Sequence, residues 1–200
     1  MDIKFKKGVD FLKAAEYSKA LAIFNGLIVE EPNNAHYYSE RGVAYFHMSS
    51  KRLSLEDMDK AIELEPSKSY RYSSRAYIRG HYGMLEEAIQ DYEKAIKLDP
   101  EDAVAHNNLG LLLEQRGYKK YANVSFKKAD ELAGISGKKG RTDIGVRGEE
   151  IEFKNLQKEI DEEKETQSLG GEIKKLFTKE GRASFFQFLK SGFKLGEKEG

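Results

Sequence analysis

Histidine is the side chain most often used for metal binding and for proton transfer near neutral pH, and this chain has four. A metal site typically needs several ligands at short, defined spacing, such as two histidines three or four residues apart on one helix. None of the four has such a neighbour. The sequence therefore predicts no metal site, and ordinary surface or groove positions for His36, His47, His81 and His106.

Other reactive groups also lack the neighbours that catalysis requires. The chain has no cysteine, which excludes thiolate chemistry and disulfides. The segment 134–138, Gly-Ile-Ser-Gly-Lys, resembles part of a phosphate loop, but it follows a predicted helix and lacks the full glycine spacing. Acid pairs such as Glu86 and Glu87 fit solvated faces or turns, and no serine lies in a nucleophile elbow. We expect neither an enzyme nor a cofactor.

Three prolines give the first information about the fold, because Pro32, Pro66 and Pro100 are 34 residues apart. A fixed period of this length indicates an internal repeat. Each repeat contains two amphipathic helical windows, and the proline follows the second window. When the repeats are aligned, two positions hold small residues in every repeat and a third holds a large apolar residue; we call each such position a column. The first small column is Gly8, Gly42, Ala76 and Gly110, and the second is Ala20, Ser54, Ala88 and Ala122. The large apolar column is Phe24, Met58, Tyr92 and Phe126.

The segment from Gly42 and Tyr45 through Ala61 to Pro66 resembles the tetratricopeptide-repeat (TPR) family, in which these residue types recur at this spacing. The resemblance implies an all-α fold in which helix hairpins stack into a superhelix, or α-solenoid, with a concave face. Stacking is required because one hairpin buries too little apolar surface to fold alone. The four expected repeats cover 1–34, 35–68, 69–102 and 103–133. Arg79 departs from the pattern, since it shares a column with Phe11, Tyr45 and Leu113.

The composition changes after the repeats. Residues 134–148 are rich in glycine and basic side chains, which predicts a linker. Residues 149–200 contain apolar residues at helical spacing, which predicts an amphipathic helical tail as a C-terminal extension. The zero net charge and the absence of a long apolar run or an apparent signal peptide lead us to expect a cytoplasmic protein.

In the family that the chain resembles, the first helix of each hairpin lines the concave groove. The resulting stripe mixes aromatic rings and histidines with few charges, which is typical of a contact surface. Val9, Val43 and Leu111 fit packing between helices equally well. The implied groove residues are Phe5, Val9, Leu12, His36, Ser39, Val43, Phe46, His47, Tyr70, Ser73, Tyr77, His81, Val104, Asn107, Leu111, Glu114 and Gln115.

The same positions argue against one ligand class of the family. Chaperone co-factors of this kind hold a C-terminal carboxylate between lysine, asparagine and arginine side chains. The corresponding positions across the first three repeats are without cations, so we expect an apolar ligand instead. They hold Phe5, Val9, Glu40, Tyr70 and Ser74.

The first functional hypothesis is a protein-interaction scaffold or adaptor that binds a partner peptide or amphipathic helix in the groove. The alternative is a peripheral membrane adaptor that uses the basic, phenylalanine-rich tail as an interfacial helix. Nucleic-acid binding is not expected. We expect the tail to dock on the repeats of its own or another copy, either in the groove or as a cap over Leu109, Leu112 and Phe126, or on a partner. The tail residues concerned are Phe177, Phe185, Phe186, Phe188, Leu189 and Phe193.

Overall fold

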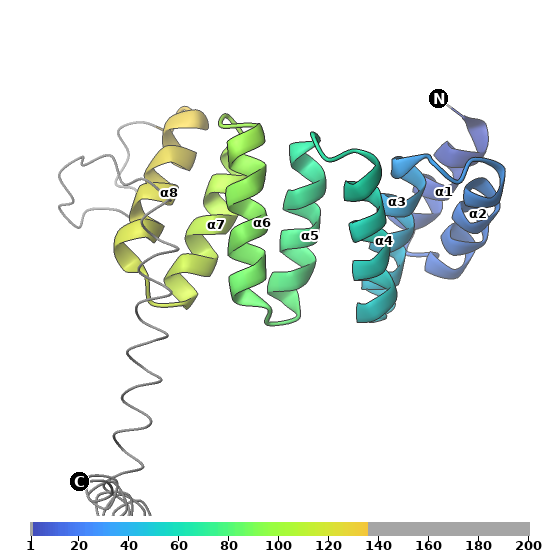
Figure 1. Ribbon diagram of the computed structural model, residues 1–200, viewed down its shortest axis with the longest axis horizontal. Helices are drawn as coiled ribbons and strands as arrows, with labels where there is room; N and C mark the ends of the chain where they lie inside the picture. Colours follow the sequence, from blue (N-terminus) through green and yellow to red (C-terminus); the bar gives the residue numbers. More distant parts are fainter. Residues whose placement is uncertain (1, 136–200) are drawn as a thin grey trace, which may run out of the picture. The chain divides into compact units, whose positions relative to one another are not determined.

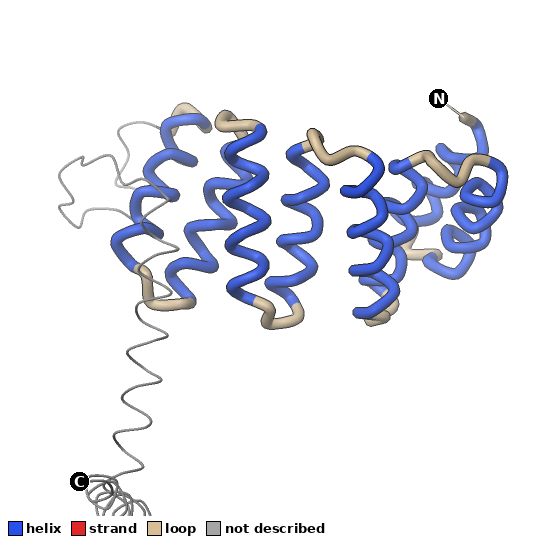
Figure 2. The backbone as a smooth tube through the Cα atoms, viewed as in Figure 1, coloured by secondary structure: helices blue, strands red, loops and turns tan. Residues whose placement is uncertain are grey.

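The computed structural model describes residues 2–135, which form eight α-helices and no strand (Figures 1 and 2). Each helix packs against the next along the chain, so that four hairpins stack in sequence order (Figure 1). The prediction of an all-α solenoid of helix hairpins is confirmed for this part of the chain. The helices are α1 (Ile3–Lys13), α2 (Tyr17–Glu30), α3 (Ala35–His47), α4 (Lys51–Leu64), α5 (Ser69–His81), α6 (Leu85–Leu98), α7 (Ala103–Gln115) and α8 (Lys119–Leu132).

Local signals explain where the helices begin and end. The side chains of Asp2, Asn34 and Asp102 accept hydrogen bonds from the first backbone N–H groups of α1, α3 and α7. Helices α2, α4 and α6 each end two residues before a proline, which cannot continue the helix. A left-handed residue reverses the chain inside every hairpin, with φ of 57° at Ala15 and Ser49, 75° at Gly83 and 93° at Gly117.

The small columns let the two helices of a hairpin approach closely. A Cβ atom on Gly8 would lie 2.7 Å from Cε1 of Phe24, and one on Gly110 would lie 2.6 Å from Cε1 of Phe126. Ala20 and Ala88 are both fully buried in the corresponding positions of the second helices. The core therefore lies between the helices of each hairpin and continues between consecutive hairpins, where Ile62, Tyr72 and Ala95 form one buried cluster.

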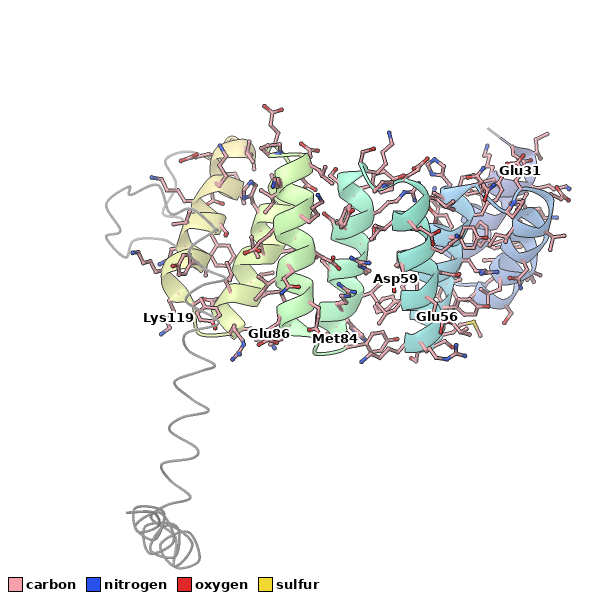
Figure 3. All side chains as sticks on the ribbon, in the orientation of Figure 1. Glu31, Glu56, Asp59, Met84, Glu86 and Lys119 are labelled. Atoms are coloured by element: carbon pink, nitrogen blue, oxygen red, sulfur yellow. The ribbon has the colours of Figure 1, made fainter. Side chains whose placement is uncertain are left out.

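A ladder of charged hydrogen bonds connects consecutive repeats. Arg41 on α3 binds both carboxylate oxygens of Asp57 on α4 at 2.7 and 2.8 Å, and its Nη1 donates to Asn25 on α2 at 2.8 Å. Arg75 on α5 repeats this arrangement with Asp91 on α6, at 2.6 and 2.8 Å. Its Nη1 donates to Asp59, which lies on α4 (Figure 3), at 2.7 Å. We call these two sets of contacts the arginine ladder.

Arg79, the residue that departs from the repeat pattern, belongs to this ladder. Its Nη1 donates to Oδ2 of Asp91 at 2.8 Å, so Asp91 lies between two arginines. The side chain of Asp91 is only 5% exposed. An arginine can therefore replace an apolar residue at this position because a buried carboxylate pairs with it.

The ladder ends at the fourth repeat, where the aligned residues are uncharged. Leu109 stands where Arg41 and Arg75 stand, and Ser125 stands where Asp57 and Asp91 stand. Leu109 and Ser125 are both fully buried. Glu93 on α6 aligns with Asp59 but has no arginine opposite it, and burial raises the pKa of Glu93 to about 7.

We expect Glu93 to make stability depend on pH. The folded protein binds a proton at Glu93 more tightly than the unfolded chain, whose carboxyl titrates near 4.5. The stability that Glu93 contributes to the folded state is therefore fully present below about pH 4.5 and is lost as the pH rises through about 7. Glu93→Gln removes this loss and should raise the free energy of unfolding at pH 8 by roughly 1–3 kcal/mol, after allowance for partial solvation. Urea unfolding at pH 5 and pH 8 measures the effect.

The matched control is Asp59→Asn, which makes the same chemical change at the aligned, arginine-paired position. This variant should gain no stability at pH 8, because it weakens the contact with Arg75. Equal stability of Glu93→Gln and the wild type at pH 8 would show that Glu93 is ionised without cost.

A second polar network holds the second and third repeats together. Arg71 on α5 is fully buried, although arginine is rarely buried unless paired. Its guanidinium forms an ion pair with Glu65, donates to the hydroxyl of Ser39 and donates to the backbone carbonyl of Ala35 at 3.2 Å. The guanidinium also holds the pKa of Glu65 below its usual value. One side chain therefore joins α3, α5 and the loop between α4 and α5.

Candidate functional site

The predicted groove residues all lie on α1, α3, α5 and α7, and none of them is buried. Large apolar groups are among the most accessible, with Val104, Tyr77, Tyr70 and Leu111 exposed by 68%, 58%, 44% and 42%. Apolar side chains of this size are candidates for contact with another molecule when they gather on one surface. Their role in binding stays a prediction.

Phe46 on α3 is the centre of an aromatic cluster that spans the second and third repeats. Its ring centroid lies 5.3 Å from that of His47, 5.8 Å from Tyr77 and 4.9 Å from His81, all at steep interplanar angles. Such edge-to-face contacts fix the orientation of the rings. We call Phe46, His47, Tyr77 and His81 the Phe46 cluster.

Two further tyrosines extend the Phe46 cluster. Tyr82 contacts Phe46 and His81 at centroid distances of 6.0 and 5.3 Å, and Tyr17 stacks on His47 at 4.9 Å. Neither tyrosine was predicted as a groove residue, because neither lies in the first helix of a hairpin. Tyr17 begins α2 and Tyr82 follows α5, so a search of the hairpin turns for aromatic residues would have found them.

The groove residues of the first repeat lie elsewhere. Phe5 contacts His36 and Tyr37 at centroid distances of 6.4 and 5.6 Å, beside a cavity of about 320 Å³ that these three residues line with Asp2 and Asn34. Phe5, Val9 and Leu12 also pack against the buried core of the first repeat. The packing alternative for Val9 is therefore supported.

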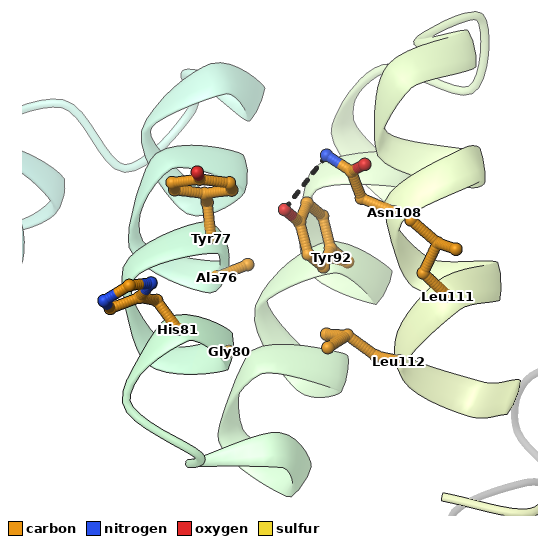
Figure 4. Close-up of a pocket in the computed structure, with 8 residues that line it drawn as sticks. All are labelled: Ala76, Tyr77, Gly80, His81, Tyr92, Asn108, Leu111 and Leu112. Atoms are coloured by element: carbon orange, nitrogen blue, oxygen red, sulfur yellow. Dashed lines mark hydrogen bonds between the residues drawn. The ribbon is translucent and has the colours of Figure 1, made fainter. Parts of the chain in front are cut away.

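An apolar cavity lies between α5 and α7, next to the Phe46 cluster. It has a volume of about 210 Å³. Tyr77, Gly80 and His81 on α5 face Leu111 and Leu112 on α7 across it (Figure 4). Ala76, Tyr92 and Asn108 complete the lining, and Nδ2 of Asn108 donates to the Tyr92 hydroxyl at 3.2 Å.

Charge is weakly represented in this region. Burial raises the pKa of Tyr92 to about 12, so its hydroxyl stays neutral. Burial also raises the pKa of Tyr70 above its usual value. Glu40 on α3 has a raised pKa as well, because burial outweighs the nearby charges of Arg71 and Lys13. No lysine, arginine or carboxylate lines the cavity between α5 and α7, so an apolar or aromatic group entering it displaces no charged side chain from water.

The polar groove residues have separate roles. Ser39 accepts a hydrogen bond from the buried Arg71, and Asn107 donates to Oδ1 of Asn108 at 3.4 Å. The hydroxyl of Ser73 is buried without a hydrogen-bond partner. Glu114 and Gln115 are exposed near the end of α7, and Val43 is partly buried on α3.

The prediction of a surface or groove position is wrong for His106. This residue is only 5% exposed, and its Nε2 lies 3.1 Å from the carbonyl oxygen of Pro100. Burial lowers the pKa of His106 below its usual value. The repeat register explains the error, since position 106 aligns with Tyr38 and Tyr72, which make the same contact with Pro32 and Pro66.

The expected cap over Leu109, Leu112 and Phe126 stays a prediction. Leu109 and Phe126 are 0% and 5% exposed, whereas Leu112 is partly buried. Phe126 packs against Gly110 within its own hairpin. The tail residues Phe177, Phe185, Phe186, Phe188, Leu189 and Phe193 lie outside the described residues.

No group of three or more histidine, aspartate and glutamate side chains within residues 2–135 could hold a metal ion. Among the eight described helices, none combines the length and the apolar character needed to cross a membrane.

Comparisons with known proteins agree with this architecture. A family model described as TPR repeat matches residues 82–117. A crystal structure of MamA is 25% identical, with a TM-score of 0.62 over 68% of this chain and 79% of that one. MamA residues 41 to the end from Desulfovibrio magneticus RS-1 are 22% identical, with a TM-score of 0.61 over 67% and 76% of the two chains.

A third similar structure contains a ligand. It is the first TPR of Spaghetti (RPAP3) bound to the HSP90 peptide SRMEEVD, which is 27% identical with a TM-score of 0.55 over 57% of this chain and 91% of that one. Comparison with curated protein sequences gives no significant match.

Proposed function

This chain is a tetratricopeptide-repeat protein, and we propose that it is a non-enzymatic interaction scaffold that binds an apolar peptide or amphipathic helix of a partner along α1, α3, α5 and α7. The observation that carries the proposal is the Phe46 cluster beside the apolar cavity of α5 and α7. Rigid aromatic rings supply contact area with little loss of side-chain entropy, and they are enriched among residues that dominate binding energy.

The similar structures support peptide binding as the general activity. The TPR domain of RPAP3 is bound to a peptide of sequence SRMEEVD. In this chain, the positions expected to hold a carboxylate carry Phe5, Val9, Glu40, Tyr70 and Ser74, and Glu40 would repel an acidic group when ionised. We therefore propose that the ligand is apolar or aromatic rather than an acidic C-terminus.

The test is a binding measurement with the full-length chain and the double variant Phe46→Ala/Tyr77→Ala. A partner is first identified by cross-linking to the wild type, and its affinity for both proteins is then measured. Because one buried aromatic anchor typically contributes about 2 kcal/mol or more and neighbouring anchors are not fully additive, we expect the double variant to lose roughly thirty- to a thousand-fold in affinity.

The control is Ile3→Ala/Val29→Ala, which truncates two apolar side chains that are 85% and 83% exposed outside the Phe46 cluster. It should bind like the wild type. Circular dichroism must show that both variants are folded. Unchanged affinity of a folded Phe46→Ala/Tyr77→Ala variant would place the binding surface elsewhere.

A further inference from the structure

A carboxylate without a partner of its own lies on α3, between the predicted groove residues Ser39 and Val43. This carboxylate belongs to Glu40, whose side chain is partly buried. Within residues 2–135 it forms no hydrogen bond and no ion pair, and burial accordingly raises its pKa. A carboxylate that has lost part of its hydration and gained no donor is available to a donor from another molecule.

Two cations act on Glu40 through space without pairing with it. The charges of Arg71 and Lys13 both lower the pKa of Glu40, but burial outweighs them. The guanidinium of Arg71 is already paired with Glu65 and donates to the hydroxyl of Ser39. Lys13 is exposed at the end of α1. Neither cation therefore occupies the hydrogen-bonding positions of the Glu40 carboxylate.

Tyr70 on α5 adds an aromatic surface within electrostatic range of Glu40. Burial is the main reason that the pKa of Tyr70 is raised, and the charges of Glu65 and Glu40 raise it further. The side chain of Tyr70 is 44% exposed, and the guanidinium carbon of Arg71 lies 4.9 Å from the centroid of its ring. A carboxylate next to an accessible aromatic ring is an arrangement that attracts lysine and arginine side chains.

The rest of the groove favours a basic ligand over an acidic one. The predicted groove residues of α3, α5 and α7 include no lysine and no arginine, and one of them, Glu114, is an acid. A cation that pairs with Glu40 recovers in the groove the interactions that it gives up in water. An acidic group at the same place is repelled instead.

Glu40 is also placed to act together with the Phe46 cluster. It precedes His47, a member of that cluster, by seven residues on α3. This spacing is about two helical turns, so both side chains lie on one face, about 10 Å apart along the helix axis. About three residues of an extended peptide, or about two turns of a helix, cover the same distance. A segment anchored on the Phe46 cluster therefore reaches Glu40 with a nearby residue.

We propose, building on the proposed function, that Glu40 and Tyr70 bind a lysine or arginine side chain of the partner segment whose apolar residues contact the Phe46 cluster. We call this pair the Glu40 subsite. The ammonium or guanidinium group donates to the carboxylate and packs against the ring. The aligned residues of the next two repeats, Ser74 and Asn108, are uncharged. The Glu40 subsite therefore fixes the register of the bound segment along the array.

The test uses synthetic peptides, so that it needs no identified partner. Peptides of about fifteen residues, long enough to span the distance in either conformation, carry phenylalanine at the centre and lysine, arginine, glutamine or glutamate at each other position in turn. Their affinities are measured for the full-length wild type and for Glu40→Gln, which removes the charge but keeps the size of the side chain. The control is Glu87→Gln, which makes the same change at an exposed position on α6.

We expect the wild type and Glu87→Gln to bind a peptide with lysine or arginine at one position at least about ten-fold more tightly than the matching glutamine peptide. Glu40→Gln should lose this preference and bind the glutamine peptide as tightly as the wild type does. A wild type that prefers no basic residue would overturn the proposal. So would a preference that persists in a folded Glu40→Gln variant.

A second variant tests the aromatic part of the Glu40 subsite. Tyr70→Leu keeps an apolar side chain but removes the ring, and it should reduce the preference for a basic residue by about two- to five-fold. An unchanged preference would contradict the role of Tyr70. Circular dichroism must show that this variant is folded.

The Glu40 subsite and the proposed function fail in different ways. Peptide binding that is lost in Phe46→Ala/Tyr77→Ala but shows no preference for a basic residue would support the proposed function and contradict the Glu40 subsite. A basic preference that depends on Glu40 but survives Phe46→Ala/Tyr77→Ala would support the Glu40 subsite and contradict the aromatic anchor. If no peptide binds the wild type, both proposals are wrong.

Discussion

Replacing Arg71 by alanine should reduce the free energy of unfolding by about 3–5 kcal/mol, which is a large part of the roughly 5–15 kcal/mol typical of a folded domain. Arg71 is fully buried and bonds Glu65, Ser39 and the carbonyl of Ala35. The substitution leaves these acceptors without their donor and creates a cavity between α3 and α5. Urea unfolding followed by circular dichroism measures the loss.

The pH dependence gives an independent check on the role of Arg71. Its guanidinium lowers the pKa of Glu65, so the contribution of this pair is present above the usual pKa of glutamate and is lost as the pH falls through the lowered value. The difference in free energy of unfolding between Arg71→Ala and the wild type should therefore become smaller at acidic pH. The control is Arg52→Ala, which breaks an exposed i,i+4 pair with Glu56 and should cost less than about 0.5 kcal/mol. A similarly small loss in Arg71→Ala would contradict our account of the network.

The second large effect concerns the arginine ladder. Asp57→Ser should cost about 3–5 kcal/mol, because it leaves the partly buried guanidinium of Arg41 with only Asn25 as a hydrogen-bond partner. The double variant Arg41→Leu/Asp57→Ser should recover most of this loss. It reproduces in the second repeat the pair that Leu109 and Ser125 form at the aligned positions of the fourth.

The cycle is completed by Arg41→Leu alone, which leaves the carboxylate of Asp57 unpaired and should also be strongly destabilising. A coupling free energy above about 2 kcal/mol between the two substitutions is the expected result. If the loss of stability in the double variant equals the sum of the losses in the two single variants, the two positions are not coupled. Other differences in packing would then explain why the fourth repeat has an uncharged pair.

Much of the fold could be predicted from the sequence because its signals are periodic. The 34-residue spacing of Pro32, Pro66 and Pro100 marks the ends of α2, α4 and α6, and the small columns mark close helix contacts. The arginine ladder could not be predicted in this way, because the residues it joins are 16 apart and occupy different positions in the aligned repeats. Arg79 therefore looked like an exception, although it shares Asp91 with Arg75.

The candidate site could be predicted only in part. Placing the first helices along one surface assigned Phe46, Tyr77 and His81 to the groove, and in the structure the rings of Tyr77 and His81 both contact that of Phe46. The cavity between α5 and α7 depends on how these two helices pack, which a sequence pattern does not contain. Burial of His106 likewise depends on a contact with the loop before its own helix.

The arginine ladder also restricts how this array can grow by gene duplication. A copy of the second repeat inserted after itself would place Asp59 opposite a second Arg41, which preserves the contact that Asp59 now makes with Arg75. A copy of the fourth repeat inserted before the third would instead place Asp59 opposite Leu109 and set Lys127, the residue aligned with Asp59, against Arg75. Like charges at that position would repel. Recombination can therefore lengthen the middle of the array, whereas its last repeat is confined to the end.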